Sequence, residues 1–360
     1  MDFLATPGGL VLAILALGVL IIVHEGGHFL IARLSGMRVD RFSIGFGPKL
    51  FSFKRGETIY QIAAIPLGGF VQIAGLNPGE EGMAADDPRA YPNRPVWQRL
   101  ATIFAGPATN YIFAAIMLVG IFLAWGVPGL GKAPVVDEVI DKSPAAAAGF
   151  QPEDEIKVVD GKKVDDSNQV LPIVNASGGK PIVVQIVRNG KPRSITVTPA
   201  KNGSGYLMGV KLGGSQIWEQ LPTGTRIGEA LAFPYRYSVF VLESIGQGGF
   251  KQIWQQGSGP VGIVKEMRKR IEQGPRQGLM LIAMISIYLG LFNLLPLPGL
   301  DGGRLMFLGW EAISRKRVNE RIEQTIHMVG VLMLLGLIVV ITVKNDIGFG
   351  SFIGKLFGHH

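Results

Sequence analysis

The sequence contains no cysteine and only five histidines in 360 residues. The absence of cysteine excludes disulfides and thiolate metal sites, so any metal ion must be bound by His, Asp or Glu. Two of the histidines, His359 and His360, end the chain and are interpreted as the remnant of an expression tag. The internal candidates for chemistry are therefore His24, His28 and His327.

Charge is also scarce, at 17% of residues, whereas 48% of residues are hydrophobic. Few charges together with long apolar runs indicate a membrane protein. The net charge of +8 does not predict nucleic-acid binding, because the basic residues gather beside the apolar runs, as they do in cytoplasmic loops. The first apolar run lacks the basic start and the small-residue cleavage site of a signal peptide, so we expect it to stay as a membrane span.

Four apolar segments have the length needed to cross about 30 Å of hydrocarbon. The loop after the first segment, residues 33–99, carries nine Lys or Arg, and the loop between the last two segments carries five. Cytoplasmic loops are enriched in these residues. The charge pattern therefore predicts that both loops are cytoplasmic, and that both chain termini and residues 126–278 are extracytoplasmic.

Two stretches between the spans predict β-structure. Residues 41–49 and 58–73 are rich in β-branched and aromatic residues and favour a hairpin or small sheet near the membrane. Asn189-Gly190 predicts a second hairpin, inside a compact α/β domain. Residues 77–95 are polar and turn-rich, which is typical of a linker. Residues 225–250 are amphipathic but charged, so an interfacial helix is favoured over a fifth span.

We therefore predict a multi-pass α-helical membrane protein with four transmembrane helices, a cytoplasmic membrane-associated β-hairpin region and an extracytoplasmic α/β domain. The predicted order is transmembrane helix 1 (1–34), a cytoplasmic loop with the hairpin or sheet (35–100), transmembrane helix 2 (101–125), the α/β domain (126–200), a linker and interfacial helix (201–278), transmembrane helix 3 (279–302), a cytoplasmic loop (303–324), transmembrane helix 4 (325–344) and a C-terminal tail (345–360).

The first predicted span contains the motif His24-Glu25-Gly26-Gly27-His28. Residues four apart lie on one face of a helix, about one turn apart. Two imidazoles at this spacing bind zinc, and the glutamate beside them can take a proton from metal-bound water. An ionisable side chain near the centre of a bilayer costs about 2.5–3.5 kcal/mol on insertion scales, so this cluster indicates a functional site.

Asp301 is the expected third ligand. The predicted topology runs both the first and the third span inward, which brings Asp301 to about the depth of His24 and His28. A catalytic zinc needs three protein ligands and a fourth position for water. The alternative is that Asp301 only caps the third span at the membrane interface.

Two prolines and two asparagines are further candidates. Pro296 and Pro298 cannot continue a regular helix, so the backbone before Asp301 should be broken and should lie beside protein or a water-filled cavity. Asn293 is a buried amide that is expected to hold the substrate backbone, to orient the site, or only to make a helix-packing hydrogen bond. Asn110 is expected either to face the metal cavity or to bond another helix, with packing slightly favoured.

Three motifs, in this order, resemble the site-2 protease family of intramembrane zinc metalloproteases, in its RseP-like branch. They are the histidine motif, Gly106-Pro107-Ala108-Thr109-Asn110, and the stretch from Asn293 to Gly302. Residues 143–164 are similar to a bacterial PDZ domain. One such pattern is present where some relatives carry two, and Glu153-Asp154 replaces the usual Gly-Asp.

The resemblance implies one Zn²⁺ per chain held by His24, His28 and Asp301, with Glu25 as general base. It also implies cleavage of the transmembrane segment of single-span membrane proteins that another protease has already trimmed. Anti-sigma factors and signal-peptide remnants are substrates of this kind. The expected location is the bacterial cytoplasmic (inner) membrane, with the lipid bilayer as the other partner and the PDZ domain outside.

Two other functions compete with the protease. A metal or ion transporter would use the same side chains as an ion path, but transporters usually contain repeated sets of spans, and no repeat is found. A membrane scaffold would use the PDZ domain to gather partners, but it leaves the histidines unexplained. If the protease is correct, an unwound substrate is expected to be held near Asn293 and the strands at 59–73, since a substrate helix hides its peptide bonds.

Overall fold

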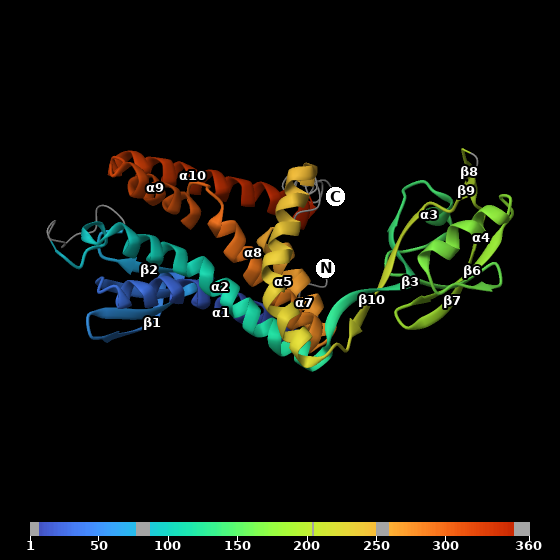
Figure 1. Cartoon of the computed structure of the whole chain (residues 1–360), viewed down its shortest axis with the longest axis horizontal. Helices are drawn as coiled ribbons and strands as arrows, with labels where there is room; N and C mark the ends of the chain where they lie inside the picture. Colours follow the sequence, from blue (N-terminus) through green and yellow to red (C-terminus); the bar gives the residue numbers. More distant parts are fainter. Residues whose placement is uncertain (1–6, 77–86, 204, 250–258, 349–360) are drawn as a thin grey trace, which may run out of the picture. The chain divides into compact units, whose positions relative to one another are not determined.

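The computed structural model describes residues 7–76, 87–203, 205–249 and 259–348 (Figure 1). The chain forms two compact units, Met1–Ala124 with Thr223–His360, and Trp125–Pro222. The elements of the first unit are α1 (Pro7–Leu34), β1 (Val39–Arg55), β2 (Thr58–Ile73), η1 (Tyr91–Asn93), α2 (Val96–Trp125), α5 (Thr223–Ser244), η3 (Ile245–Gly249), α7 (Pro260–Glu272), α8 (Pro275–Leu294), α9 (Asp301–Ser314), α10 (Glu320–Ile341) and η4 (Thr342–Gly348). The predicted linker at 77–95 lies partly outside the described residues, and His359 and His360 lie wholly outside them.

Four helices of the first unit are long and apolar enough to cross a membrane. Their apolar stretches are Val11–Leu34, Val96–Trp125, Pro275–Leu294 and Arg321–Asp346. The last of these turns large apolar side chains outward, such as Leu332 and Met333, which are 61% and 70% exposed. Apolar surface in water is unfavourable by about 25 cal/mol per Å². These exposed faces therefore fit a lipid environment, and the prediction of a four-span membrane protein agrees with the structure.

The third helix is shorter at its end than predicted, because α8 stops at Leu294 and not at residue 302. Proline has no backbone N–H and disfavours a helical residue before it, so Pro296 and Pro298 end the helix. A turn follows, and α9 begins at Asp301. The predicted loop at 303–324 is consequently helical over much of its length.

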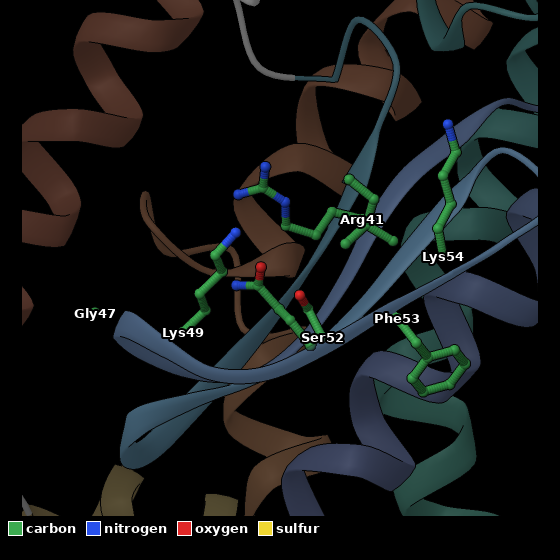
Figure 2. Close-up of a pocket in the computed structure, with 8 residues that line it drawn as sticks. Arg41, Gly47, Lys49, Ser52, Phe53 and Lys54 are labelled. Atoms are coloured by element: carbon green, nitrogen blue, oxygen red, sulfur yellow. The ribbon is translucent and has the colours of Figure 1, made fainter.

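β1 and β2 form an antiparallel hairpin with repeated register shifts. Such shifts, or β-bulges, bend a strand and increase its twist. A cavity of about 410 Å³ lies on the hairpin, and Figure 2 shows the side chains of Arg41, Lys49 and Lys54 extending to one side and the ring of Phe53 to the other. The described residues that line this cavity include no His, Asp or Glu, so it is not a candidate metal centre.

The second unit is built on an antiparallel sheet with strand order β10-β3-β4-β6-β7. Its elements are β3 (Val127–Val139), α3 (Pro144–Ala148), β4 (Glu155–Val159), β5 (Lys162–Lys163), η2 (Ser167–Gln169), α4 (Val170–Ala176), β6 (Ile182–Arg188), β7 (Lys191–Val197), β8 (Ala200–Asn202), β9 (Gly205–Leu207) and β10 (Val210–Glu219). β6 and β7 pair across Asn189-Gly190, where both residues have positive φ, as the sequence predicted.

The second unit extends beyond the boundary predicted at residue 200. β10 pairs with β3 from Val210 opposite Val139 to Glu219 opposite Val127. The backbone groups of β3 would lack these partners without β10, and buried backbone groups are nearly always paired. Residues 201–222 therefore complete this domain and are not a linker, which corrects the predicted division.

α5 covers most of the predicted interfacial helix, but it packs against two of the apolar helices. The hydroxyl of Ser238 lies 2.8 Å from that of Tyr111 on α2, and the hydroxyl of Tyr237 lies 2.8 Å from that of Tyr288 on α8. Both contacts lie within apolar stretches of these helices. The short helix α7, which also belongs to the first unit, was not predicted from the sequence.

Candidate metal centre

α1 presents His24 and His28 on one face, since four residues make about one helical turn. The helix is continuous from Pro7 to Leu34, so the spacing of the two side chains is set by its backbone hydrogen bonds. His28 is buried, with 8% of its surface exposed. Glu25 lines the same cavity as both histidines.

Asp301 approaches these histidines from the start of α9. Its Oδ2 lies 3.1 Å from Nε2 of His24 and 3.3 Å from Nε2 of His28. The two Nε2 atoms are 3.3 Å apart. The sequence prediction that these three side chains meet therefore agrees with the geometry, although they lie 277 and 273 residues apart from Asp301 along the chain.

These separations suit a zinc ion. Three ligand atoms about 2.0–2.1 Å from a tetrahedral zinc lie about 3.3–3.4 Å from one another. Oδ2 of Asp301 is buried and has no hydrogen bond among the described residues, although both imidazoles are within ion-pair distance. The short Nε2–Oδ2 distances and the missing hydrogen bond are compatible, because a neutral imidazole with its proton on Nδ1 has no proton on Nε2 to donate to Asp301. A cation among three acceptors satisfies all of them.

α2 comes against α1 at the metal centre because small residues face it. A Cβ on Gly27 would lie 2.4 Å from the backbone oxygen of Ala105, and a Cβ on Gly106 would lie 2.2 Å from Nε2 of His28. A side chain at position 27 would push the two helices apart, and one at position 106 would displace the imidazole of His28. The close approach lets Nδ1 of His28 lie 2.8 Å from the backbone oxygen of Thr102. A hydrogen bond there keeps the proton on Nδ1 and leaves Nε2 for a metal.

Asn110 holds the other histidine. Its side chain is completely buried, and its amide nitrogen lies 3.0 Å from Nδ1 of His24. Its Oδ1 has no hydrogen bond within the described part of the chain. The backbone oxygen of Asn110 accepts a hydrogen bond from Ser286 on α8. The side chain of Asn110 thus contacts a proposed ligand, while its backbone oxygen joins two of the apolar helices.

A cavity of about 380 Å³ opens beside the three ligating atoms. Its lining includes Glu25, Arg304 and His327, and the hairpin contributes Gly69 to Val71. The other predicted site residues do not line it, namely Asn110, Asn293, Pro296 and Pro298. The side chain of Asn293 is partly exposed and not buried, which corrects the prediction for it. The sequence assigns no role to His327, because a lone histidine on an apolar span carries no motif.

An ion pair that the sequence did not reveal holds α9 against α2. The guanidinium of Arg99 donates to both carboxylate oxygens of Glu311, at 2.9 Å and 2.6 Å, and the two side chains are 6% and 12% exposed. Arg317 also donates to Glu311 at 2.9 Å. Burial alone would raise the pKa of Glu311, but the hydrogen bonds from these arginines outweigh it and lower that pKa. The pair fixes the helix that begins at Asp301 beside the helix that contacts His28.

Comparison with known proteins places this geometry in a family. The model of peptidase family M50 matches residues 12–337. This range contains the four side chains of the candidate site, His24, Glu25, His28 and Asp301. The chain belongs to peptidase family M50. It is a zinc metalloprotease of the site-2 type and a multi-pass protein of the bacterial inner membrane.

Two bacterial relatives are similar over nearly their whole length. Zinc metalloprotease RasP of Geobacillus kaustophilus is 32% identical, over 93% of this chain and 96% of its own. Regulator of sigma-W protease RasP of Bacillus subtilis is 30% identical, over 93% of this chain and 97% of its own. The similarity therefore includes the second unit as well as the membrane helices.

Proposed function

We propose that this metalloprotease cleaves peptide bonds inside the transmembrane segments of single-span membrane proteins. The observation that carries the proposal is the position of His24, His28, Asp301 and Glu25 around one cavity, on or next to helices apolar enough to span a membrane. A protease that acts on soluble peptides would have no reason to place charged groups there, where each costs several kcal/mol.

In this mechanism His24, His28 and Asp301 hold one zinc ion per chain. The ion would supply a Lewis acid that polarises the scissile carbonyl and lowers the pKa of a water molecule toward 7. Glu25 takes the proton of the attacking water and delivers it to the leaving amine. Thr102 and Asn110 orient the two imidazoles through their Nδ1 atoms.

The substrate enters the cavity as an extended strand, because the peptide bonds of a helix are closed off by their own hydrogen bonds. Gly69 to Val71 of β2 line the cavity and offer a strand to pair with it. Pro296 and Pro298 act by ending α8, so that Asp301 can turn toward the histidines. Asn293, near the end of α8 beside that turn, is proposed to contact the substrate outside the cavity.

The proposed substrates and topology follow from the family and from the charge pattern. One relative is named as a regulator of sigma-W, which suggests anti-sigma factors as substrates; signal-peptide remnants are a second class. We propose that the second unit is an extracytoplasmic PDZ domain, that both termini are extracytoplasmic and that the hairpin is cytoplasmic. In this arrangement another protease first removes the bulk of the substrate outside the membrane.

The test is the variant Glu25→Gln in the full-length protein, with a tagged single-span substrate in the same membrane. We expect cleavage to fall by about 10²–10⁴-fold, the usual contribution of a general base, while zinc stays near one per chain. Glu138→Gln is the matched control, because Glu138 is an exposed residue of the second unit that pairs with Lys211. Undiminished cleavage in Glu25→Gln would contradict the mechanism.

The ligand set is tested by His24→Ala and Asp301→Ala, each of which should lose most of its zinc. Normal zinc content in both would show that the metal is held elsewhere. If neither the wild-type protein nor any variant cleaved membrane substrates but the wild type moved zinc across a liposome membrane, the transporter would replace the protease.

A further inference from the structure

The third internal histidine, His327, lies on α10 at the wall of the metal-centre cavity. Its Nδ1 accepts a hydrogen bond from the backbone N–H of Gly299, at 3.0 Å. A neutral imidazole that accepts at Nδ1 carries its proton at Nε2. Nε2 of His327 is buried and has no hydrogen-bond partner among the described residues. His327 therefore offers a donor that the protein itself does not use.

The position of this donor is fixed by close packing of α10 on the turn before Asp301. A Cβ on Gly330 would lie 2.2 Å from the backbone oxygen of Pro298, and a Cβ on Gly299 would lie 2.8 Å from the backbone nitrogen of Val331. The backbone of α10 is thus in direct contact with the backbone of the turn, next to the hydrogen bond between Gly299 and His327. The imidazole cannot turn away without breaking that bond, so its donor is held ready for a ligand.

Buried polar groups nearly always have a hydrogen-bond partner, and one that lacks it calls for an explanation. The missing partner must be an acceptor that reaches the cavity. An unwound peptide brings one such acceptor with each residue, because its carbonyl oxygens have lost the hydrogen bonds of the helix. We propose that Nε2–H of His327 donates to a backbone carbonyl oxygen of the bound substrate. The inference rests on the proposed function, in that it needs a peptide strand in the cavity.

The ring also contacts the helix of the third ligand, which suggests a competing role. Its Cε1 would lie 3.1 Å from a Cβ on Gly303, two residues after Asp301, and its ring stands edge-on to Phe307 at 5.7 Å between centroids. A shifted carboxylate of Asp301 could accept from His327, and the histidine would then orient a metal ligand. The two roles differ in what they affect, since one changes the affinity for substrate and the other the affinity for zinc.

Two substitutions test the roles of the two ring nitrogens of His327 separately. In His327→Asn the side-chain oxygen lies close to the position of Nδ1 and still accepts from Gly299, while no donor reaches the position of Nε2. In His327→Gln the amide reaches the position of Nε2 and restores a donor there. Both variants are made in the full-length protein, and also together with Glu25→Gln, so that binding of a fluorescent single-span peptide is measured without turnover.

We expect His327→Asn to weaken peptide binding by about tenfold, as for the loss of one hydrogen bond, and to raise KM by the same factor with kcat within twofold. Zinc affinity and melting temperature should stay at the wild-type values. His327→Gln should bind peptide within threefold of the wild type. This pattern supports a donor to the substrate.

Three results would overturn the inference: unchanged peptide binding in His327→Asn, a loss of zinc affinity in that variant, or equal losses of peptide binding in His327→Asn and His327→Gln. Failure of the proposed function looks different. In that case the wild-type protein does not cleave the peptide, and the binding comparison between the two variants is still read on its own.

Discussion

Asn110 gives the most direct test of how the metal centre is organised. Because Nε2 of His24 points at His28 and Asp301, the proton of His24 must sit on Nδ1 when the metal is bound. Nδ1–H then needs an acceptor, and the amide of Asn110 is the group 3.0 Å away. Rotating that amide by 180° exchanges its nitrogen for Oδ1, the atom that has no hydrogen bond within the described part of the chain.

The rotated amide orients His24 and makes its Nε2 a better ligand. Groups of this kind typically contribute 10–100-fold to metal affinity, which is about 1.4–2.7 kcal/mol. Asn110→Leu keeps nearly the same volume at a completely buried position and removes the acceptor. We therefore expect the dissociation constant for zinc to rise by about 10–100-fold in Asn110→Leu. Asn110→Asp, which keeps an oxygen at this place, should retain most of the affinity.

The assay is competition with a zinc chelator, using the full-length protein in detergent micelles. Ser286→Ala is the matched control, because Ser286 is equally buried and bonds to the backbone oxygen of Asn110 without touching its side chain. It should change the zinc affinity less than twofold. If Asn110→Leu binds zinc as tightly as the wild type, or if Ser286→Ala loses as much, Asn110 serves helix packing alone and the argument is refuted.

Two further predictions concern stability. Arg99→Met should lower the free energy of unfolding by about 1.5–3 kcal/mol, since it removes two charge-assisted hydrogen bonds from the buried Glu311 and leaves it with Arg317, while adding Glu311→Leu should recover most of this loss. The lowered pKa of Glu311 means that the ion pair stabilises the protein above the usual pKa of glutamate and that this contribution is lost as the pH falls through the lowered value. On acidification the wild type should therefore lose stability relative to the double variant, which has no carboxyl group at residue 311. A difference in melting temperature that does not change with pH would contradict this. In the second unit, Arg188→Gln should cost about 3 kcal/mol because it strands the fully buried Asp154, whereas Lys211→Gln, from an exposed pair, should cost less than about 1 kcal/mol; equal melting temperatures would refute the distinction.

The proximity of His24, His28 and Asp301 could be predicted from the sequence because their signals are local or follow from composition. His24 and His28 are spaced by one helical turn, and the charges of the loops set the direction of each span. Direction alone brings Asp301 to the depth of the histidines. Pro296 and Pro298 likewise predicted that the helix breaks before Asp301, although not that a new helix begins with it.

The supporting contacts could not be predicted, because they depend on packing between distant segments. Arg99 and Glu311 are 212 residues apart, and neither has a neighbour in sequence that marks it as half of a buried pair. The same holds for β10, whose residues look like a linker until β3 is beside them. Asn293 was the opposite case, since an amide within an apolar run was expected to be buried and is partly exposed where the helix ends.

His327 shows why the fourth span belongs to the metal-centre cavity. Glu323 lies four residues before it on α10, but no motif marks either residue, so the sequence alone assigns His327 no role. Its role is inferred from the turn at Gly299, whose backbone N–H donates to Nδ1 and so leaves the ring proton on Nε2. The proline-broken segment thus does two things at once: it aims a carboxylate at the histidines of α1, and it fixes the proton of a histidine on α10. A change in that turn would disturb both, so variants there cannot separate metal binding from substrate binding, whereas variants at residue 327 can.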